Sequence, residues 1–208
     1  MNLTEATSRA HWDEVYSSKR ADEVSWHQAR PELPLKLIRR TGVGRDAALI
    51  DVGGGASTLA DHLLAEGFKD VSVLDIAAAG LAQARARLGG DAARIEWIAA
   101  DITRWRPARR YALWHDRAVL HFLLTPQDQA AYAASLRAAL PSGGWAIIGG
   151  FAPNGPTRCS GLEIVQHDTQ SLSALLGADF VPMETHGEIH LTPHGREQAF
   201  RHHIFQRK

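Results

Sequence analysis

The sequence has little cysteine and no excess of charge of either sign. Cys159 is the single cysteine among 208 residues, so no disulfide can form within the chain and no thiolate cluster can bind a metal. Lysine plus arginine and aspartate plus glutamate each number 23, so the formal net charge at pH 7 is zero. This balance argues against binding to duplex nucleic acid, because neutralising phosphates takes an excess of basic residues.

Membrane and export signals are also lacking. No apolar stretch approaches the roughly 20 residues that span a bilayer, and the opening MNLTEATSRA lacks the apolar core of a signal peptide. We therefore expect a cytoplasmic protein that does not cross a membrane. Hydrophobic residues make up 45% of the chain and charged residues 22%, which is enough for a packed core. The length favours one domain spanning residues 1–208.

Apolar segments with strand character alternate with helical segments from residue 47 onward. Thr125 and Pro126 are a typical N-cap and first residue of a helix. The strand–helix–strand repeat makes right-handed crossovers, so it predicts a parallel sheet with helices on both faces. The predicted strands are 47–52, 71–75, 95–101, 111–116 and 144–151, and the predicted helices are 58–67, 77–88 and 125–140.

The pattern changes after residue 151. A loop is expected at 153–168 and a short helix at 171–177, and no helix separates the apolar runs 180–186 and 198–206. Two strands joined by a turn predict an antiparallel hairpin at the sheet edge. The expected fold class is α/β, a Rossmann-like three-layer sandwich with a seven-stranded, mostly parallel sheet and an antiparallel C-terminal strand. An apolar stripe predicts that helices within residues 1–46 lie over the core, residues 47–208.

Carboxylates follow the predicted parallel strands at their carboxyl ends, where open α/β sheets bind ligands. Glycines after the first strand let a ligand approach the backbone. Asp75 lies 20 residues after Gly55, at the end of the second strand, where an acid can accept hydrogen bonds from a ribose diol. A cofactor that contains a nucleoside is therefore predicted. The strand-end acids are Asp51, Asp75, Asp101 and Asp116, and the glycines are Gly53, Gly54 and Gly55.

Two cofactors fit this arrangement, a nicotinamide dinucleotide and S-adenosylmethionine. The dinucleotide fingerprint has a third glycine where this chain has Thr58. Asp51 stands two residues before the first glycine, where a carboxylate would repel a pyrophosphate but attract the amino group and sulfonium of S-adenosylmethionine. The residues favour S-adenosylmethionine, and the alternatives are an NAD(P)-dependent oxidoreductase and a non-catalytic cofactor-binding protein.

The segments IDVGGGAST, VLDI and AADIT resemble those of class I, seven-β-strand, S-adenosylmethionine-dependent methyltransferases. The resemblance covers roughly residues 47–206, and Ser57 and Thr58 depart from the third glycine of many members. It implies transfer of a methyl group from S-adenosylmethionine to an acceptor. It also implies a set of cofactor-binding residues: Asp51 near the methionine amino group, Gly53 and Gly55 under the methionine part, Asp75 on the ribose, Ile76 against adenine, and Asp101 with Ile102 at the adenine amino group.

The N-terminal segments HWDEVYSSK and VSWHQ are similar to the W-D-x-x-Y opening of small methyltransferases that include eukaryotic protein-lysine enzymes. The resemblance implies that Trp12, Tyr16 and Trp26 cover the cofactor and that residues 1–46 form a lid. Trp12 and Tyr16 are one helical turn apart, so they share a face. The alternative is that these aromatic side chains simply dock a helix on the core.

Candidates for acceptor chemistry follow the fourth strand. His115, Asp116 and His121 are expected where an acceptor meets the methyl group, and histidine is suited to proton transfer near neutral pH. The alternative is that they hold a loop. Cys159 lies in the segment where such folds build the acceptor pocket, but a lone thiol there is more often part of the packing.

The acceptor is expected to be a small molecule, with a protein lysine as the alternative. The chain lacks the Asn-Pro-Pro-aromatic tetrad that the resemblance would link to methylation of DNA bases or glutamine, which argues against a nucleic-acid acceptor. His186, His190 and His194 are spaced by four, but Gly187 and Pro193 break any helix that would bring them together, so no metal site is predicted.

Overall fold

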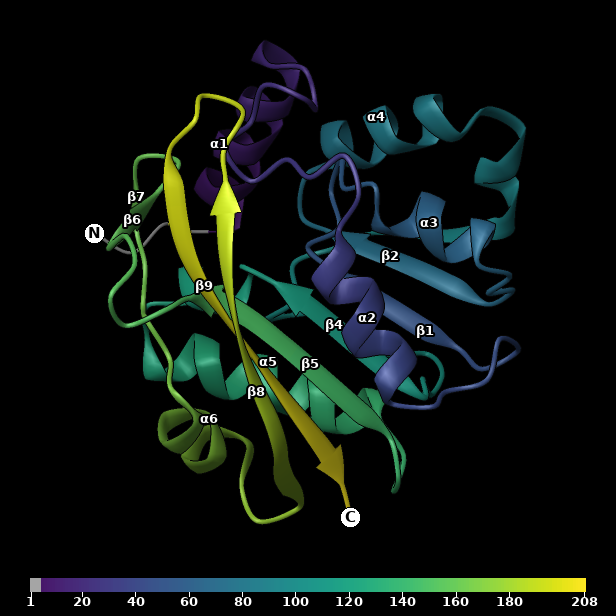
Figure 1. Cartoon of the computed structure of the whole chain (residues 1–208), viewed down its shortest axis with the longest axis vertical. Helices are drawn as coiled ribbons and strands as arrows, with labels where there is room; N and C mark the ends of the chain where they lie inside the picture. Colours follow the sequence, from purple (N-terminus) through teal and green to yellow (C-terminus); the bar gives the residue numbers. More distant parts are fainter. Residues whose placement is uncertain (1–4) are drawn as a thin grey trace.

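The computed structural model describes residues 5–208 (Figure 1). Helices alternate with strands through most of the chain, as the sequence pattern predicts. In chain order the elements are α1 (Glu5–Ser18), α2 (Glu32–Arg40), β1 (Leu49–Val52), α3 (Leu59–Ala65), β2 (Val71–Asp75), α4 (Ala78–Leu88), η1 (Gly89–Arg94), β3 (Ile95–Ala99), β4 (Leu113–Arg117), η2 (Leu120–Phe122), α5 (Pro126–Ala139), β5 (Trp145–Phe151), β6 (Arg158–Cys159), β7 (Leu162–Glu163), α6 (Thr169–Leu176), β8 (Phe180–Leu191) and β9 (Glu197–Arg207).

The main sheet has seven strands in the order β3-β2-β1-β4-β5-β9-β8. The five strands from β3 to β5 run parallel, and β9 runs antiparallel to both β5 and β8. The predicted fold class is confirmed, including the antiparallel C-terminal strand and the hairpin at the sheet edge. This order brings the carboxyl ends of the parallel strands to one edge of the sheet.

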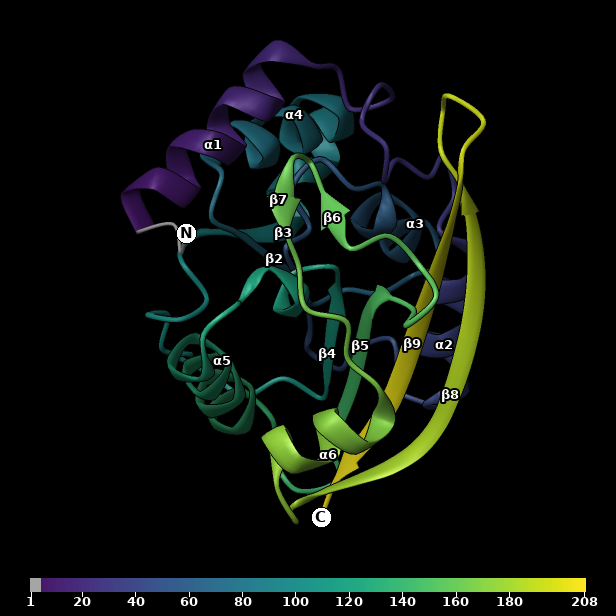
Figure 2. The same cartoon turned by 90° about the vertical axis from the view of Figure 1, so that its left-hand side faces the viewer.

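Helices cover both faces of the sheet, which makes three layers (Figure 2). On one face α2 and α3 bury Leu35, Ile38 and Leu63 against the strands. On the other face α5 and α6 pack around Trp114 and Tyr132. Successive side chains of a strand point to opposite faces, so β4 places Leu113 and His115 toward α2 and α3, and Trp114 and Asp116 toward α5.

The segment between β5 and α6 differs from its prediction. Where a loop was expected, β6 and β7 pair as a short hairpin. Ser160 and Gly161 connect them with φ of 50° and 80°, and positive φ at both central residues is typical of tight hairpin turns. Strands of two residues are too short to give a periodic pattern, although a Ser-Gly pair is a turn signal.

The N-terminal segment is held by residues distant in the sequence. His190 on β8 donates its Nε2–H to the carbonyl of Ser25 across 2.7 Å, and Gln28 donates to Glu188 across 2.6 Å. Thr58, which stands where a third glycine was considered, donates to the carbonyl of Gln28 across 2.9 Å. The hairpin β8–β9 and the helix after the glycine loop therefore clamp residues 24–28 from two sides.

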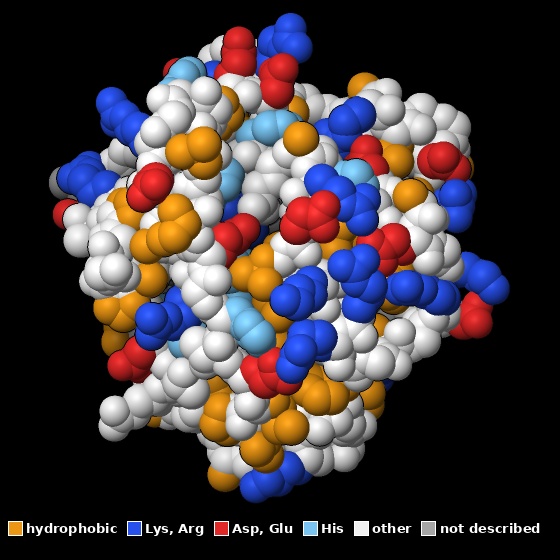
Figure 3. Space-filling view, viewed as in Figure 1, with side chains coloured by type: hydrophobic (Ala, Val, Ile, Leu, Met, Phe, Trp, Pro, Cys, Tyr) orange, Lys and Arg blue, Asp and Glu red, His pale blue; other side chains and the backbone are white. Residues whose placement is uncertain are grey.

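Acidic and basic side chains are interspersed over α2 and α3 on the face seen in Figure 3. Glu66 is contacted by Arg30, Arg39 and Arg45 at 3.3, 3.0 and 3.7 Å. Glu66 thus offsets part of the positive charge on this face. Among residues 5–208, no helix is long and apolar enough to cross a membrane.

Candidate functional site

A cavity of about 610 Å³ opens at the carboxyl ends of the parallel strands. Its size is within the range of small-molecule and cofactor sites. It receives residues from α1, from the loops after β1 to β4, from the hairpin β6–β7 and from β9. Among the residues that line it are Trp12, Tyr16, Trp26, Gly53, Asp75, Ile76, Asp101, Ile102, Arg117, Phe122, Phe151, Cys159, Gln198 and Phe200.

One end of the cavity has two carboxylates on neighbouring strands. Asp75 closes β2, and its Oδ1 accepts the backbone N–H of Ala77 at 2.8 Å. Burial raises the pKa of Asp75 to about 7. Asp101 follows β3 and accepts both the N–H and the hydroxyl of Thr103 at 2.8 Å. Because the predicted Ile76 and Ile102 also line this end, it combines hydrogen-bond acceptors with apolar walls, as a nucleoside requires.

The glycine loop lies under a tyrosine. Gly53 lines the cavity with φ of +72°. A Cβ at Gly55 would meet the hydroxyl of Tyr16, and one at Gly80 would lie 2.9 Å from Cε2 of the same ring. Glycine at both positions therefore lets the Tyr16 ring sit against the loop and the start of α4.

The three predicted aromatic side chains come together. The ring centroid of Trp12 lies 5.8 Å from that of Trp26 and 5.0 Å from that of Phe122, and the centroids of Tyr16 and Trp26 are 6.1 Å apart. All four rings line the cavity. Asp13, between Trp12 and Tyr16 in the chain, accepts the N–H of Ala79 at 3.1 Å and ties α1 to the first turn of α4. The role of these rings as a lid stays a prediction.

Asp51 and His115 form a buried pair beneath the glycine loop. Nδ1 of His115 lies 2.7 Å from Oδ1 of Asp51, and the two residues are only 2% and 3% exposed. They line a second, small cavity of about 40 Å³ that shares Gly53, Trp26 and Arg117 with the main one. Asp51 lines the small cavity and not the main one, so a methionine amino group would have to reach it through the small cavity.

Asp116 points away from both cavities. Its carboxylate is fully buried and accepts the hydroxyl of Tyr132 at 2.7 Å and the N–H groups of Val119 and Leu120 at 2.8 and 3.1 Å. Burial raises its pKa to about 6. Strand alternation places it on the α5 face, so the expectation that it faces an acceptor does not match its position, and it caps η2 instead.

His121 also lies behind the cavity wall. It is 2% exposed, and its ring centroid lies 4.3 Å from that of Phe122 and 5.4 Å from that of Phe151. Neither ring nitrogen has a hydrogen-bond partner among the described residues. Burial, with Arg117 nearby, lowers its pKa to about 3, so the ring is neutral at physiological pH. Of the three predicted candidates, only His115 reaches a cavity.

The other end of the main cavity is aromatic; Cys159 was considered there from the sequence, whereas Phe151, Phe200 and Gln198 were not. Phe151 and Phe200 pack together with Cys159, which is 8% exposed. Burial raises the pKa of this thiol to about 11, so it is protonated. Arg117 and Gln198 also line this end. Strand alternation could have placed Arg117 beside His115, but only tertiary structure brings β9 to it.

A comparison with family models identifies part of the chain. Residues 49–144, just under half of the sequence, match the family described as a methyltransferase domain. No curated protein matches the sequence. The matched residues include the glycine loop and the strand ends that carry Asp51, Asp75 and Asp101.

Solved structures share the fold at low sequence identity. An S-adenosylmethionine-dependent methyltransferase from Anabaena variabilis has a TM-score of 0.76 and 14% identity, over 98% of this chain and 95% of its own. The N-methyltransferase NodS from Bradyrhizobium japonicum, in complex with S-adenosylhomocysteine, has a TM-score of 0.70 and 16% identity, over 93% and 97%. The 1,6-didemethyltoxoflavin-N1-methyltransferase from Burkholderia thailandensis, with bound 1,6-didemethyltoxoflavin and S-adenosylhomocysteine, has a TM-score of 0.68 and 20% identity, over 99% and 91%.

The family match and the site agree on the cofactor. The glycine loop, two strand-end carboxylates and a cavity that joins them to an aromatic end suit S-adenosylmethionine, and the methyltransferase match favours it over a nicotinamide dinucleotide. The similarity to protein-lysine enzymes has no counterpart in these comparisons. Residues 49–144 thus match a methyltransferase domain, and the whole chain has the Rossmann-like fold of the solved methyltransferases; both findings support S-adenosylmethionine as the cofactor.

Proposed function

We propose that the protein methylates a small molecule that binds inside the main cavity. The observation that carries this proposal is the continuity of the cavity, which joins the carboxylates of Asp75 and Asp101 to the aromatic end around Phe151 and Phe200. Trp12 and the hairpin β6–β7 line the same space. An acceptor enclosed there is limited in size, whereas a protein acceptor has to send one side chain into the space.

S-adenosylmethionine supplies a methyl group on a positively charged sulfur, which keeps the electrons of the broken bond and leaves as S-adenosylhomocysteine. The protein then has to align an acceptor lone pair with the methyl carbon and keep water out. The residues that would hold the nucleoside are Asp75, Ile76, Asp101 and Ile102, and Gly53 and Gly55 would run beneath the methionine part. Trp12, Tyr16 and Trp26 are suited to covering it.

A proton has to leave when the acceptor is an amine, a thiol or a carboxylic acid. His115 is the residue best suited to take it, because Asp51 binds Nδ1 and leaves the Nε2 lone pair without a partner among residues 5–208. His115 lines the small cavity, which shares Trp26, Gly53 and Arg117 with the main one. Asp116 and His121 are less suited, since both are buried behind the wall.

Two of the structural neighbours are named as N-methyltransferases, and one of them holds 1,6-didemethyltoxoflavin. These names support, without deciding, an enclosed small acceptor. The second candidate is a protein lysine, because the W-D-x-x-Y segment with Trp12 and Tyr16 is similar to that of protein-lysine enzymes. A cytoplasmic location also stays a prediction.

The deciding experiment is transfer of a labelled methyl group from S-adenosylmethionine into a cell lysate divided by size. We expect label in the small-molecule fraction, and an Asp75→Ala variant should lose most of it because cofactor binding weakens. Label that remains with the proteins, and moves to peptides that contain methyl-lysine after proteolysis, would contradict the small-molecule proposal and support the second candidate.

A further inference from the structure

Arg117 is a buried cation whose hydrogen bonds are incomplete. Its side chain is 11% exposed. Nη1 donates to the carbonyl of Trp26 at 3.2 Å, and the guanidinium lies 4.3 Å from the centroid of the Phe200 ring. Nε and Nη2 are buried and have no hydrogen-bond partner among the described residues. Such unpaired buried donors are costly and call for an explanation.

The nearest carboxylate does not satisfy these donors. Oε2 of Glu188 lies 3.9 Å from Nε of Arg117, which is close enough to offset charge but too far for a hydrogen bond. Glu188 instead accepts from Gln28 at 2.6 Å and from His202 at 2.9 Å. Burial alone would raise the pKa of Glu188, but His202 and Arg117 outweigh it and lower the pKa to about 2. The pair of Arg117 and Glu188 is therefore neutral, and the N–H groups of two nitrogens, Nε and Nη2, have no acceptor among the described residues.

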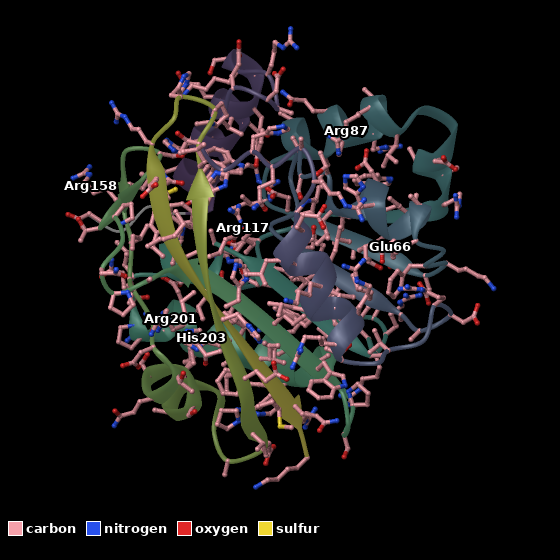
Figure 4. The ribbon with its side chains drawn as sticks, viewed as in Figure 1. Glu66, Arg87, Arg117, Arg158, Arg201 and His203 are labelled. Carbon is pink, nitrogen blue, oxygen red and sulfur yellow. The ribbon has the colours of Figure 1, made fainter. Side chains whose placement is uncertain are left out.

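The two free donors have a defined geometry. Nε and Nη2 form one side of the planar guanidinium, where two parallel N–H bonds match the two oxygens of a carboxylate. The side chain, labelled in Figure 4, is among the residues that line the main cavity, as is Gln198, whose buried Oε1 also has no partner in the described chain. One ligand can satisfy both groups if it presents a carboxylate to Arg117 and an N–H to Gln198.

The strand order separates this place from the nucleoside end. Asp101 and Asp75 follow β3 and β2, on one side of β1, whereas Arg117 follows β4 and its guanidinium extends to Phe200 on β9. In the sheet, β9 is the third strand beyond β1, and neighbouring strands are about 4.8 Å apart. Arg117 lines both cavities, and its guanidinium lies over the Phe200 ring at the aromatic end of the main one.

We propose that the methyl acceptor is a small carboxylic acid whose carboxylate is held side-on by Nε and Nη2 of Arg117. Its apolar or aromatic body lies against Phe122 and Phe151, and an N–H of the acceptor, where present, is accepted by Gln198. This inference rests on the proposed function, because it assigns the acceptor end of the same cavity.

Benzoate and its neutral amide, benzamide, test whether Nε and Nη2 of Arg117 bind a carboxylate. Calorimetric titration of the protein saturated with S-adenosylhomocysteine should show benzoate binding at least about tenfold tighter than benzamide, since charge-assisted bidentate hydrogen bonds are worth that much. Arg117→Lys keeps the charge that offsets Glu188 but loses the two parallel N–H donors, so the preference should fall to near one. Arg201→Lys, an exposed arginine on the same strand as Phe200, is the matched control and should keep it.

A second variant covers the case in which Arg117→Lys does not fold. Gln198→Glu adds a negative charge, so it should weaken benzoate but not benzamide, whose N–H the new carboxylate can still accept. Equal affinity of the two probes for the wild type overturns the proposal, and so does a preference that survives Arg117→Lys.

A third result would show that Arg117 binds the cofactor and not the acceptor. If Arg117→Lys weakens S-adenosylhomocysteine about tenfold but leaves 5′-methylthioadenosine, which lacks the amino acid part, unchanged, Arg117 binds the methionine carboxylate and the acceptor proposal is wrong. The proposed function would fail in a different way. No methyl group would be transferred to small molecules, even if the protein bound benzoate more tightly than benzamide.

Discussion

His115 and Asp51 are bound to each other across 2.7 Å between two neighbouring parallel strands, at the same level of the sheet. A carboxylate can only accept, so Nδ1 of His115 is the donor of this hydrogen bond. Nε2 has no partner among the described residues and is the nitrogen that a general base would use.

Replacing His115 by Gln should lower turnover by ~10² to 10⁴ and change the affinity for S-adenosylhomocysteine little, because the proton acceptor is lost but the nucleoside contacts remain. Steady-state kinetics on the identified acceptor, with calorimetric titration, measures both. His194→Gln, at an exposed turn, is the control. Near-full turnover of a folded His115→Gln variant would show that no base acts at this position.

Asp75→Ala should weaken S-adenosylhomocysteine binding by ~1.5 to 3 kcal/mol, the range for losing hydrogen bonds to a charged group. In the wild type the affinity should also fall below pH 7, by up to about tenfold per pH unit, because the raised pKa of about 7 means that a proton must leave before the carboxylate accepts the ribose diol. Titrations at pH 6, 7 and 8 test this. An affinity that Asp75→Ala leaves unchanged would remove the ribose assignment.

Asp116→Ala should destabilise the protein by roughly 2 to 5 kcal/mol, since three donors lose their buried acceptor. Tyr132→Phe removes one of these bonds and should cost about 1 to 2 kcal/mol. Chemical denaturation gives both values. The remaining folded protein should still bind S-adenosylhomocysteine with wild-type affinity, and a selective loss of turnover in stable Asp116→Ala protein would instead return this residue to the catalytic candidates.

The free energy of unfolding should decrease as the pH falls below 6.5, in part because of His121. Its pKa is about 3 in the folded protein and near 6.5 when unfolded, so between these values the unfolded chain binds the extra proton and gains stability relative to the native state. His121→Phe should flatten the dependence by about 1.4 kcal/mol per pH unit between pH 6 and 4. Urea titrations across this range measure the slope, and an unchanged slope would mean that His121 is protonated in the native state.

Gly80→Ala should disturb the packing of the Tyr16 ring against the start of α4. A Cβ there would lie 2.9 Å from the Tyr16 ring and 3.2 Å from Cα of Gly55, although alanine is ordinarily the better helix residue. We expect a lower melting temperature, a change in tryptophan fluorescence and weaker cofactor binding. Gly90→Ala is the matched control, because a Cβ at Gly90 meets nothing within 4 Å. If the two variants behave alike, Tyr16 does not depend on this contact.

Local signals in the sequence were sufficient for most of the fold. The strand at residues 71–75 and the helix that Thr125 caps were predicted almost to the residue, because burial and capping are encoded within a few positions; the Thr125 hydroxyl accepts the N–H of Asp128 at 3.1 Å. β8 was predicted to end at residue 186 but continues to Leu191. Its second half alternates between half-buried and exposed residues, but Glu188 and His190 face inward while Ile189 and Leu191 are exposed, so the hydrophobic pattern that marks a strand is reversed.

The site was predictable only in part. Asp75 and Asp101 follow from strand ends, a rule that needs no tertiary detail. Period-two alternation on β4 could have separated Asp116 from His115, since the side chain that follows Trp114 by two positions shares its face. Arg117 and Phe200 could not be paired, because they are 83 positions apart and meet only through the order of strands β4, β5 and β9.

The clamp on residues 24–28 has a consequence for how the protein is made. Ser25 and His190 are 165 positions apart, and Gln28 and Glu188 are 160 apart. A growing chain on the ribosome therefore presents α1, α2 and the glycine loop long before the strand that fastens them exists. The cover over the cavity can be completed only after β8 has emerged and paired with β9, so we expect a nascent chain that stops before residue 188 to expose Trp12 and Trp26 and to retain no cofactor.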